Sequence, residues 1–504
     1  MKVGYRSCRV RLGVWLLPLL CAGLAPAQRT IHVDDDHPGD KGPGDPTLSN
    51  SKEDGSFFSP FDAIQEAIET AQPGDTILVA DGVYRGLGNI DLRLRGKAIT
   101  LRSEHGSSHC TIDCEFLGRG LDLIEGEGPE TVVEGFTIRN GFLSGDENVG
   151  AGIRIVRSNP TIRDCVLVEN EIGGFLGGGA GMYLRDSDAR IENCRIERNA
   201  APGFFSRGAG LLLEFSDPVI TGCEIAFNEV SFVGGGIMCD MNSRPLIHQT
   251  LISHNTTGPS GLGGGIICQA SSHATIEQCI IRDNRAISTA GVLILQGSNV
   301  TLRDSLIVNN LSDVVGSGIH CGGESSALIH NCTIVGNTKS GISCLSSVPS
   351  IENCILAENG KVGDDLDRCV ATFSLISDGD EGLGNLRGDP GFRGPDDFRL
   401  RPDSRCRDQG NPLVGLNAGE SDLGGVPRVM CSRLDIGAYE FGLGDGNCDG
   451  VMSVLDLEPW SDCATGPENP EFDTACSAFD YDINGSIDLR DLGAFFNAFG
   501  TEIP

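Results

Sequence analysis

The amino-acid sequence predicts an all-β fold, a right-handed parallel β-helix solenoid of about ten coils. Three observations support this prediction. One phrase of residues recurs at a period in the twenties, its apolar segments are too short for helices, and the 504-residue chain contains 70 glycines but only two tryptophans. Short strands separated by many turns account for all three.

The repeated phrase is Ile-x-x-Cys-x-Ile-x-x-Asn, followed by a Gly-rich stretch and an apolar triplet. One column of the repeat is asparagine, and its successive members lie 22 to 30 residues apart. These asparagines are Asn140, Asn170, Asn199, Asn228, Asn255, Asn284, Asn310, Asn337 and Asn359. Two or three strands with their turns fill one such repeat, so we expect equivalent residues to stack about 4.8 Å apart on successive coils.

Other columns of the repeat are apolar and are expected to point inward. The aliphatic column comprises Ile162, Ile191, Ile220, Ile247, Ile276, Leu302, Ile329 and Ile351. A cysteine column comprises Cys165, Cys194, Cys223, Cys279, Cys332 and Cys354, and a second one comprises Cys239, Cys268, Cys321 and Cys344. The asparagines are expected at a turn, where the side-chain amide bonds the main chain and its stacked neighbours.

Most of the 20 cysteines are not expected to form disulfides. Cysteines in register on neighbouring coils have parallel Cβ vectors, whereas a disulfide needs converging vectors and a shorter Cβ separation. We therefore interpret most column cysteines as small buried thiols. Better disulfide candidates lie outside the columns, at Cys110–Cys114, Cys406–Cys431 and Cys463–Cys476.

The N-terminus has the pattern of a secretory signal peptide over residues 1–27. Basic residues precede the apolar run Leu12–Leu24, and Ala25-Pro26-Ala27 then fits the rule for cleavage after small residues. The pattern predicts a secreted or cell-surface protein. No later run of ~20 apolar residues follows, so the mature chain is not expected to span a membrane.

Next along the chain, Phe61–Ala71 has apolar residues at helical spacing. This amphipathic pattern predicts a helix that caps the N-terminal end of the solenoid and covers its unpaired strand edges. The first strand is expected to begin within Gly74–Val79.

The chain is strongly acidic, with 70 Asp and Glu against 38 Lys and Arg and a formal net charge of -32. Nucleic acids and anionic membrane surfaces require a basic face, so neither is an expected partner. We expect a monomer.

Two stretches resemble secreted pectate-lyase-like β-helix proteins. IHVDDD with FDAIQEAIETAQPGDTILVADGVYRG resembles their opening, and DPGFRGPDDFRLRPDSRCRDQGNP with LDIGAYEF resembles their closing segment. The resemblance implies that residues 28–441 form the β-helix with its caps. It also implies an extracellular polysaccharide or surface glycan as partner. It does not specify an activity, because the family includes lyases, hydrolases and adhesins.

Residues 442–504 contain two loops with oxygen ligands at the spacing that a seven-coordinate Ca²⁺ requires. The expected ligands of the first loop are Asp445, Asn447, Asp449, Val451, Ser453 and Asp456, and those of the second are Asp480, Asp482, Asn484, Ser486, Asp488 and Asp491. Each loop has Gly at its sixth position and ends in Asp followed by Leu. The pair resembles a dockerin module, an EF-hand-type unit of small α-helices, which implies a cohesin-like protein partner. No cohesin-recognition residues match, and the segment between the loops is longer than usual.

Candidate catalytic residues are sought on the outward row that follows each Gly-rich turn. Arg185, Glu214 and Asp240 lie at equivalent positions of successive coils and are the candidates for a polar patch. A lyase needs an arginine or lysine to take the proton α to a uronate carboxylate, and a hydrolase needs two carboxylates at a defined separation. The alternative is that these are ordinary charges of a solvent-facing strand.

Two functions therefore remain open. The preferred one is a non-catalytic scaffold that binds glycans or surfaces and is attached through its calcium module. The other is a polysaccharide lyase or glycoside hydrolase with its site between Arg154 and Gln269. A flank that concentrates ionisable and aromatic side chains in one groove would favour the enzyme.

Overall fold

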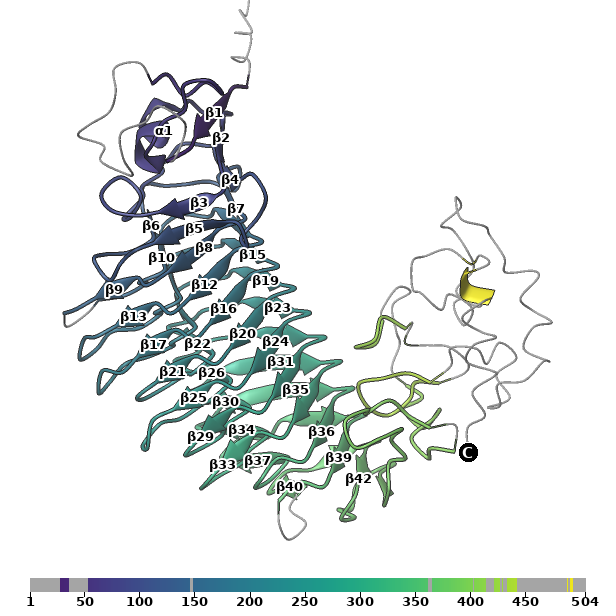
Figure 1. The fold of residues 1–504 in the computed structure, drawn as a ribbon. Coiled ribbons are helices and arrows are strands. Elements are labelled where there is room, and N and C mark those ends of the chain that lie inside the picture. Colours follow the sequence, from purple (N-terminus) through teal and green to yellow (C-terminus); the bar gives the residue numbers. More distant parts are fainter. Residues whose placement is uncertain are drawn as a thin grey trace, which may run out of the picture.

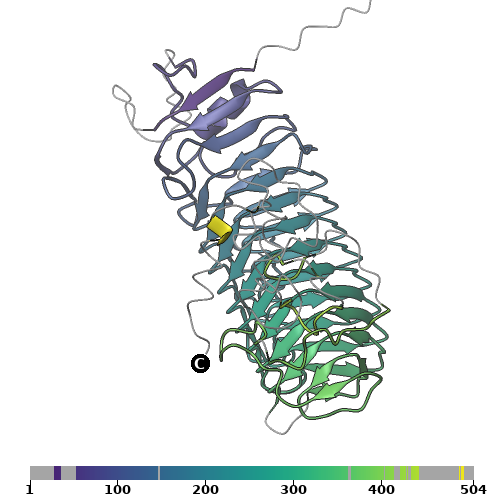
Figure 2. The same ribbon diagram turned by 90° about the vertical axis from the view of Figure 1, so that its right-hand side faces the viewer.

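The chain winds into a long solenoid of parallel strands (Figures 1 and 2). The structure is a computed structural model that describes residues 28–35, 53–145, 148–360, 365–401, 403–413, 421–426, 428, 433–441, 487 and 490–492. These residues hold 43 strands in four sheets, arranged in about 11 turns. The all-β solenoid predicted from the repeat is confirmed, with slightly more turns than expected.

Two sheets of thirteen strands form two walls of the solenoid. Sheet A consists of β1 (Thr30–Val33), β2 (Thr76–Val79), β4 (Thr100–Ser103), β7 (Val132–Glu134), β11 (Thr161–Arg163), β15 (Arg190–Glu192), β19 (Val219–Thr221), β23 (Leu246–His248), β27 (Thr275–Glu277), β31 (Asn299–Arg303), β35 (Ser326–His330), β38 (Ser350–Glu352) and β41 (Ala371–Thr372). Sheet B consists of β3 (Gly82–Tyr84), β5 (Cys110–Asp113), β8 (Thr137–Arg139), β12 (Val166–Val168), β16 (Arg195–Glu197), β20 (Glu224–Ala226), β24 (Leu251–Ser253), β28 (Ile280–Arg282), β32 (Leu306–Val308), β36 (Thr333–Val335), β39 (Ile355–Ala357), β42 (Leu375–Ile376) and β43 (Leu386–Arg387).

Two further sheets complete the coil. Sheet C consists of β9 (Phe142–Leu143), β13 (Glu171–Ile172), β17 (Ala200–Ala201), β21 (Glu229–Val230), β25 (Thr256–Thr257), β29 (Arg285–Ala286) and β33 (Leu311–Ser312). Sheet D consists of β6 (Leu121–Leu123), β10 (Ile153–Val156), β14 (Met182–Arg185), β18 (Leu211–Glu214), β22 (Ile237–Asp240), β26 (Ile266–Cys268), β30 (Val292–Ile294), β34 (Ile319–Gly322), β37 (Ile342–Leu345) and β40 (Leu366–Asp367). One coil runs through sheets D, A, B and C in that order.

The core consists of the inward columns, as the repeat predicts. Ile162, Ile191 and Ile220 pair in register on β11, β15 and β19, and the whole aliphatic column is at most 2% exposed. A bend separates sheet A from sheet B, and residues there adopt a left-handed backbone, as at Asp164 with φ 54° and Gly222 with φ 64°. The residue after this bend is the small inward one, which explains the cysteine column.

The asparagine column forms a buried ladder between sheets B and C. Each amide donates to the Oδ1 of the next asparagine, as from Asn199 to Asn228 at 3.0 Å, and to a main-chain carbonyl of the preceding coil. The ladder runs from Asn170 to Asn359. The prediction that Asn140 belongs to this column is wrong. Asn140 adopts φ 56° and its side-chain amide donates to Asp113, and the main-chain N–H of Gly141 bonds Asn170 Oδ1 in its place.

A second ladder, of serines, was not foreseen. It lies between sheets D and A, where each main-chain N–H donates to the hydroxyl of the next serine at 3.1–3.2 Å. Its members are Ser187, Ser216, Ser243, Ser272, Ser298 and Ser325. Both ladders satisfy turn groups that burial would otherwise leave without partners.

The cysteine predictions are partly confirmed. The six cysteines of the first column, together with Cys239, Cys268 and Cys321, are buried free thiols. Cys344 is the exception, because it forms a disulfide with Cys369. Cys369 lies just beyond β40 and outside any column, so its Cβ vector converges on that of Cys344.

Two expected disulfides are wrong. Cys110 and Cys114 are free thiols, because four residues of extended chain place their Cα atoms roughly 13 Å apart, too far to bridge. Cys406 is also a free thiol and packs in an apolar cluster with Phe398, Leu400 and Ile436. The pair Cys463–Cys476 lies outside the described residues.

The helix α1 (Ile64–Thr70) is shorter than the predicted segment and buries Ile64, Ala67 and Ile68. It lies at the N-terminal end of the solenoid, beside β1 and β2 (Figure 1). Nowhere in the described part of the chain is a helix long and apolar enough to cross a bilayer. The expected signal peptide lies outside the described residues.

The segment after β43 folds back along the last coils. Its anchor is Arg428, a fully buried guanidinium that pairs with Asp304 at 2.5 Å and with Glu440 at 3.0 Å. Gln278 also donates to the carbonyl oxygens of Ser421 and Asp422, at 3.0 and 2.8 Å. These contacts cover the outer surface of sheet B at its C-terminal end.

Candidate functional site

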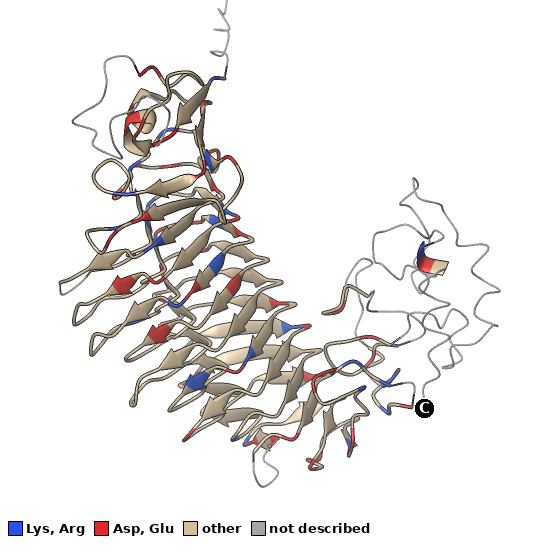
Figure 3. Ribbon diagram, viewed as in Figure 1, with Lys and Arg blue, Asp and Glu red and all other residues tan. Residues whose placement is uncertain are grey.

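The three predicted catalytic candidates lie side by side on sheet D. Arg185 pairs in register with Glu214, and Glu214 pairs with Asp240, on β14, β18 and β22. Acidic and basic residues occur along the whole solenoid (Figure 3), so contacts rather than position must show whether a site is assembled.

Arg185 and Glu214 line a cleft of about 710 Å³ on the outer surface of sheet D. We call it the arginine cleft, and define it by the charged and tyrosine side chains that line it. These are Arg154, Tyr183, Arg185, Arg207 and Glu214. Asp240 does not line the cleft, but it contacts Arg207.

Arg207 joins the two predicted carboxylates. Its Nη2 lies 3.1 Å from Glu214 Oε1, and its Nη1 lies 3.1 Å from Asp240 Oδ2. The Tyr183 hydroxyl donates to Glu214 Oε2 at 2.7 Å, and Arg185 Nη1 lies 3.7 Å from the same oxygen. Glu214 and Asp240 are only 4% and 3% exposed, so both carboxylates serve to hold Arg207 and Tyr183 in place.

Burial and hydrogen bonding fix the protonation states in the cleft. Burial raises the pKa of Tyr183, and the bond to Glu214 raises it further, so the phenol keeps its proton. The hydrogen bond with Tyr183 raises the pKa of Arg185, which therefore stays cationic. Burial also raises the pKa of Asp240, although Arg207 opposes this shift.

The N-terminal end of the cleft has a surplus of positive charge. Arg154 donates to both oxygens of Asp122 at 2.7 and 2.9 Å. Arg93 and Arg119 lie 3.2 and 3.6 Å from the same carboxylate. Burial lowers the pKa of Arg119 to about 10, so it is still charged at neutral pH. Three guanidinium groups therefore surround Asp122, and the Asp91 carboxylate also attracts Arg119 and Arg154, which leaves one positive charge in excess.

Phenylalanines from the loops between sheets C and D form an aromatic wall, which we define as Phe175, Phe204, Phe205 and Phe232. The rings of Phe204 and Phe205 are 4.8 Å apart, and those of Phe205 and Phe232 are 5.4 Å apart. Phe204 is 68% exposed, and Phe205 and Phe232 line the arginine cleft. Exposed rings beside polar groups give a surface on which the apolar face of a sugar can lie.

This arrangement suits binding better than proton transfer. A hydrolase needs two accessible carboxylates, but Glu214 and Asp240 are buried and bridged by Arg207. An arginine that serves as the base of a lyase must first give up its own proton, and the hydrogen bond with Tyr183 raises the pKa of Arg185, which disfavours that loss. The cleft therefore offers fixed cations and an apolar wall.

Sequence reasoning missed Arg207 and the aromatic wall, because both lie in loops outside the repeated phrase. Arg207 occupies a column that the structure defines by isolated bridges between successive loops. The other members are Val149, Gly178, Val233, Leu262 and Ser288. The only hint in the sequence was that Arg207 is the one charged residue in a column of small or apolar residues.

The predicted calcium ligands fall almost entirely outside the described residues. Asp491 is described, and its side chain is buried. Elsewhere in the described chain, Glu53, Asp62 and Glu66 place carboxylate oxygens within 4.8 Å of one another. This group lies at the N-terminal end, away from the arginine cleft.

A family model described as a right handed beta helix region matches residues 175–312 and 288–375. The match and the parallel strands establish a right-handed β-helix. No curated protein matches the chain.

Solved structures with a similar fold include a pectate lyase, Pel9A, at 15% identity, covering 82% of this chain and 96% of that one with a TM-score of 0.45. The complex of XylC with xylose shows 10% identity over 73% of this chain and 88% of that one, with a TM-score of 0.42. The A-module of the mannuronan C-5 epimerase AlgE6 from Azotobacter vinelandii shows 17% identity over 65% and 94%, with a TM-score of 0.36. At these identities the likeness concerns the fold alone.

Proposed function

We propose that this protein binds an acidic polysaccharide in the arginine cleft and acts as a scaffold rather than an enzyme. One observation carries the proposal. Arg154, Arg185 and Arg207 converge beside an aromatic wall, in a chain whose formal net charge is -32. Cations concentrated at one place in an acidic protein favour an anionic ligand there.

The contacts indicate how such a ligand would be held. Arg185 is about half exposed and Arg154 about a quarter exposed, so each can offer N–H donors to a uronate carboxylate. Glu214 and Asp240 hold Arg207 in a fixed orientation, which lowers the entropy cost of binding. Phe205 would then lie against the apolar face of the sugar ring.

The test is a calorimetric titration of the full chain with oligogalacturonate and with a neutral oligosaccharide of equal length. We expect binding of the acidic ligand alone, weakened about tenfold in Arg185→Gln, because one charge-assisted hydrogen bond is lost. Arg198→Gln is the matched control, since Arg198 also lies over a phenylalanine and beside a glutamate, but in the bend directly after β16 of sheet B. Equal weakening in both variants, or equal binding of both ligands, would refute the proposal.

A lyase is the second candidate, because the cleft does concentrate ionisable and aromatic side chains on one flank. Incubation with acidic polysaccharides, with and without Ca²⁺, would give new ultraviolet absorbance from an unsaturated product if the protein cleaves them. New absorbance that disappears in Arg185→Ala would show that the protein is a lyase and not a non-catalytic scaffold.

We further propose that residues 442–504 bind two Ca²⁺ ions and attach the exported protein to a surface or a cohesin-like partner. The support is the ligand spacing in the two loops. Calorimetry of the full chain should show two Ca²⁺ sites, each lost when its first ligand is replaced, in Asp445→Ala and in Asp480→Ala. An unchanged Ca²⁺ titration in the double variant would reject the loop assignment.

A further inference from the structure

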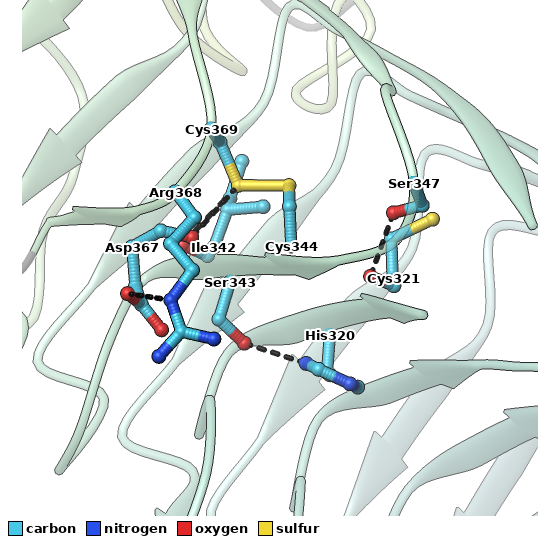
Figure 4. The surroundings of a disulfide bond; sticks show 9 residues. All are labelled: His320, Cys321, Ile342, Ser343, Cys344, Ser347, Asp367, Arg368 and Cys369. Atoms are coloured by element: carbon cyan, nitrogen blue, oxygen red, sulfur yellow. Dashed lines mark hydrogen bonds and ion pairs between the residues drawn. A yellow bond between two sulfur atoms is a disulfide. The ribbon is translucent and has the colours of Figure 1, made fainter. Parts of the chain in front are cut away.

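A second cleft, of about 650 Å³, lies on the same outer surface of sheet D near its C-terminal end. Its floor comes from β34, β37 and β40, and its side comes from the loop that follows β33. We call it the disulfide cleft, because Cys344 lines it and is bonded to Cys369 (Figure 4). A cleft of this size holds one or two sugar rings.

The rim of the disulfide cleft carries three basic side chains and two acidic ones, Asp313 and Asp367, which leaves one positive charge in excess. Arg285, Lys339 and Arg368 line it, and all three are exposed. Among the described residues, the side chains of Arg285 and Lys339 form no ion pair, and Arg368 lies 3.5 Å from Asp367. In a chain with a net charge of -32, cations left without an acidic partner mark a place for an external anion.

The floor of the disulfide cleft carries hydrogen-bonding groups. His320 Nδ1 and Ser343 Oγ are 2.7 Å apart (Figure 4), and His320 is 8% exposed. Burial lowers the pKa of His320, so the ring is neutral at pH 7; its Nδ1 is bonded to Ser343, and its Nε2 is the remaining hydrogen-bonding atom. Ser312 and Thr338 add hydroxyl groups, both linked through the Ser317 hydroxyl at 2.8 and 2.9 Å. Hydroxyls and a neutral imidazole are suitable partners for sugar hydroxyls.

The disulfide holds part of the rim in place. β40 has two residues and pairs with β37 at only two positions, Ile342 with Leu366 and Ser343 with Asp367. Arg368 follows directly and precedes Cys369, whose bond to Cys344 fixes this short strand to β37. Without the bond, so short a strand would separate easily and take Asp367 and Arg368 from the rim.

We propose that the disulfide cleft is a second binding site, for an acidic sugar of one or two rings, and that the Cys344–Cys369 bond keeps it assembled. The choice of an acidic sugar rests on the proposed function of the arginine cleft. The two sites are separated by four strand spacings between β18 and β34, roughly 19 Å. A long acidic chain could therefore engage both sites, with a gain in avidity.

The test is calorimetry of the full oxidised chain with digalacturonate, and separately with inorganic sulfate as a plain anion. Two sites per chain are expected for the sugar. Arg285→Gln with Lys339→Gln should abolish one site, and Arg185→Gln should weaken the other about tenfold. Arg244→Gln, an exposed arginine without an ion pair among the described residues, is the matched control. A single site in the wild type, weakened in Arg185→Gln and unchanged in the Arg285→Gln, Lys339→Gln variant, would overturn the second site and leave the first intact.

Redox dependence gives an independent readout. The double variant Cys344→Ser, Cys369→Ser should lose the second site and keep the first. Both cysteines are replaced because Cys344, if left alone, could form a disulfide with Cys321, its partner in the neighbouring strand. A thermal melt like that of the wild type would show that the solenoid is folded. Undiminished binding at both sites in this folded variant would contradict the role of the bond. Sulfate that binds as tightly as the sugar would exclude a sugar site.

Discussion

The asparagine ladder allows a stability prediction that can be worked out bond by bond. Asn228 donates to the carbonyl of Ile196 at 2.8 Å and to Asn255 Oδ1 at 2.9 Å. Its own Oδ1 accepts from the main-chain N–H of Asn199 at 3.1 Å and from the Asn199 amide at 3.0 Å. All of these groups are buried, so Asn228→Ala removes four buried hydrogen bonds, although Asn255 Oδ1 keeps the main-chain N–H of residue 228 and the Asn199 side-chain amide keeps the Leu167 carbonyl.

The expected cost follows from these four hydrogen bonds. Each buried hydrogen bond contributes about 1 kcal/mol net, so Asn228→Ala should lower the free energy of unfolding by about 4 kcal/mol. Glu229→Ala is the control, because its exposed side chain lies next in sequence and should change the free energy by less than about 0.5 kcal/mol.

Urea unfolding of both variants measures the difference in the free energy of unfolding. Hydrogen exchange at the main-chain N–H of Asn199 measures the local effect. We expect exchange at Asn199 to accelerate in Asn228→Ala only. A free energy of unfolding for Asn228→Ala within about 1 kcal/mol of that for Glu229→Ala would show that the ladder does not stabilise the coils in this way.

Three further predictions test the closing segment and the aromatic wall. Arg428→Met leaves Asp304 and Glu440 buried without their cation, so it should lower the free energy of unfolding measured in urea by about 3–5 kcal/mol. An unchanged free energy would mean that the attraction in these ion pairs only balances the cost of removing the charges from water. Burial raises the pKa of Asp435 to about 7, so the folded state holds a proton that the unfolded state has released between about pH 4 and 7. Stability should therefore fall as the pH rises through this window, and Asp435→Asn should make melting temperatures less dependent on pH; identical profiles would contradict this. Phe204→Ala should weaken oligogalacturonate binding severalfold without changing the melting temperature. Phe58→Ala is the control, because its ring is 83% exposed but lies at the N-terminal end of the chain, and it should change neither quantity. Equal weakening of binding in both variants would show that the aromatic wall is not part of the site.

The fold was predictable because the solenoid repeats its constraints. Ile191 or Cys194 can be assigned inward from the recurrence of its type alone, and a parallel β-solenoid follows from the period. The disulfide was not predictable in this way, since Cys369 lies where the repeat has already ended. Asn140 was misplaced by one residue because, in the coil of β7 and β8, Gly141 rather than an asparagine stands at the ladder position.

The candidate site was only partly predictable. Register alone places Arg185, Glu214 and Asp240 together, and the structure confirms that they are neighbours. Their roles depend on Arg207, which comes from a loop of variable length and converts two candidate catalytic carboxylates into an ion-pair network. A repeat pattern specifies strands better than the loops between them, and here the loops complete the site.

The most direct test of a binding scaffold is a diffraction map of the protein soaked with an acidic oligosaccharide. We predict density in the arginine cleft, with a uronate carboxylate about 2.7–2.9 Å from a guanidinium nitrogen of Arg185 or Arg154 and a ring against Phe205. Density for the sugar elsewhere on the solenoid, with the arginine cleft empty at saturating ligand, would contradict the proposed function.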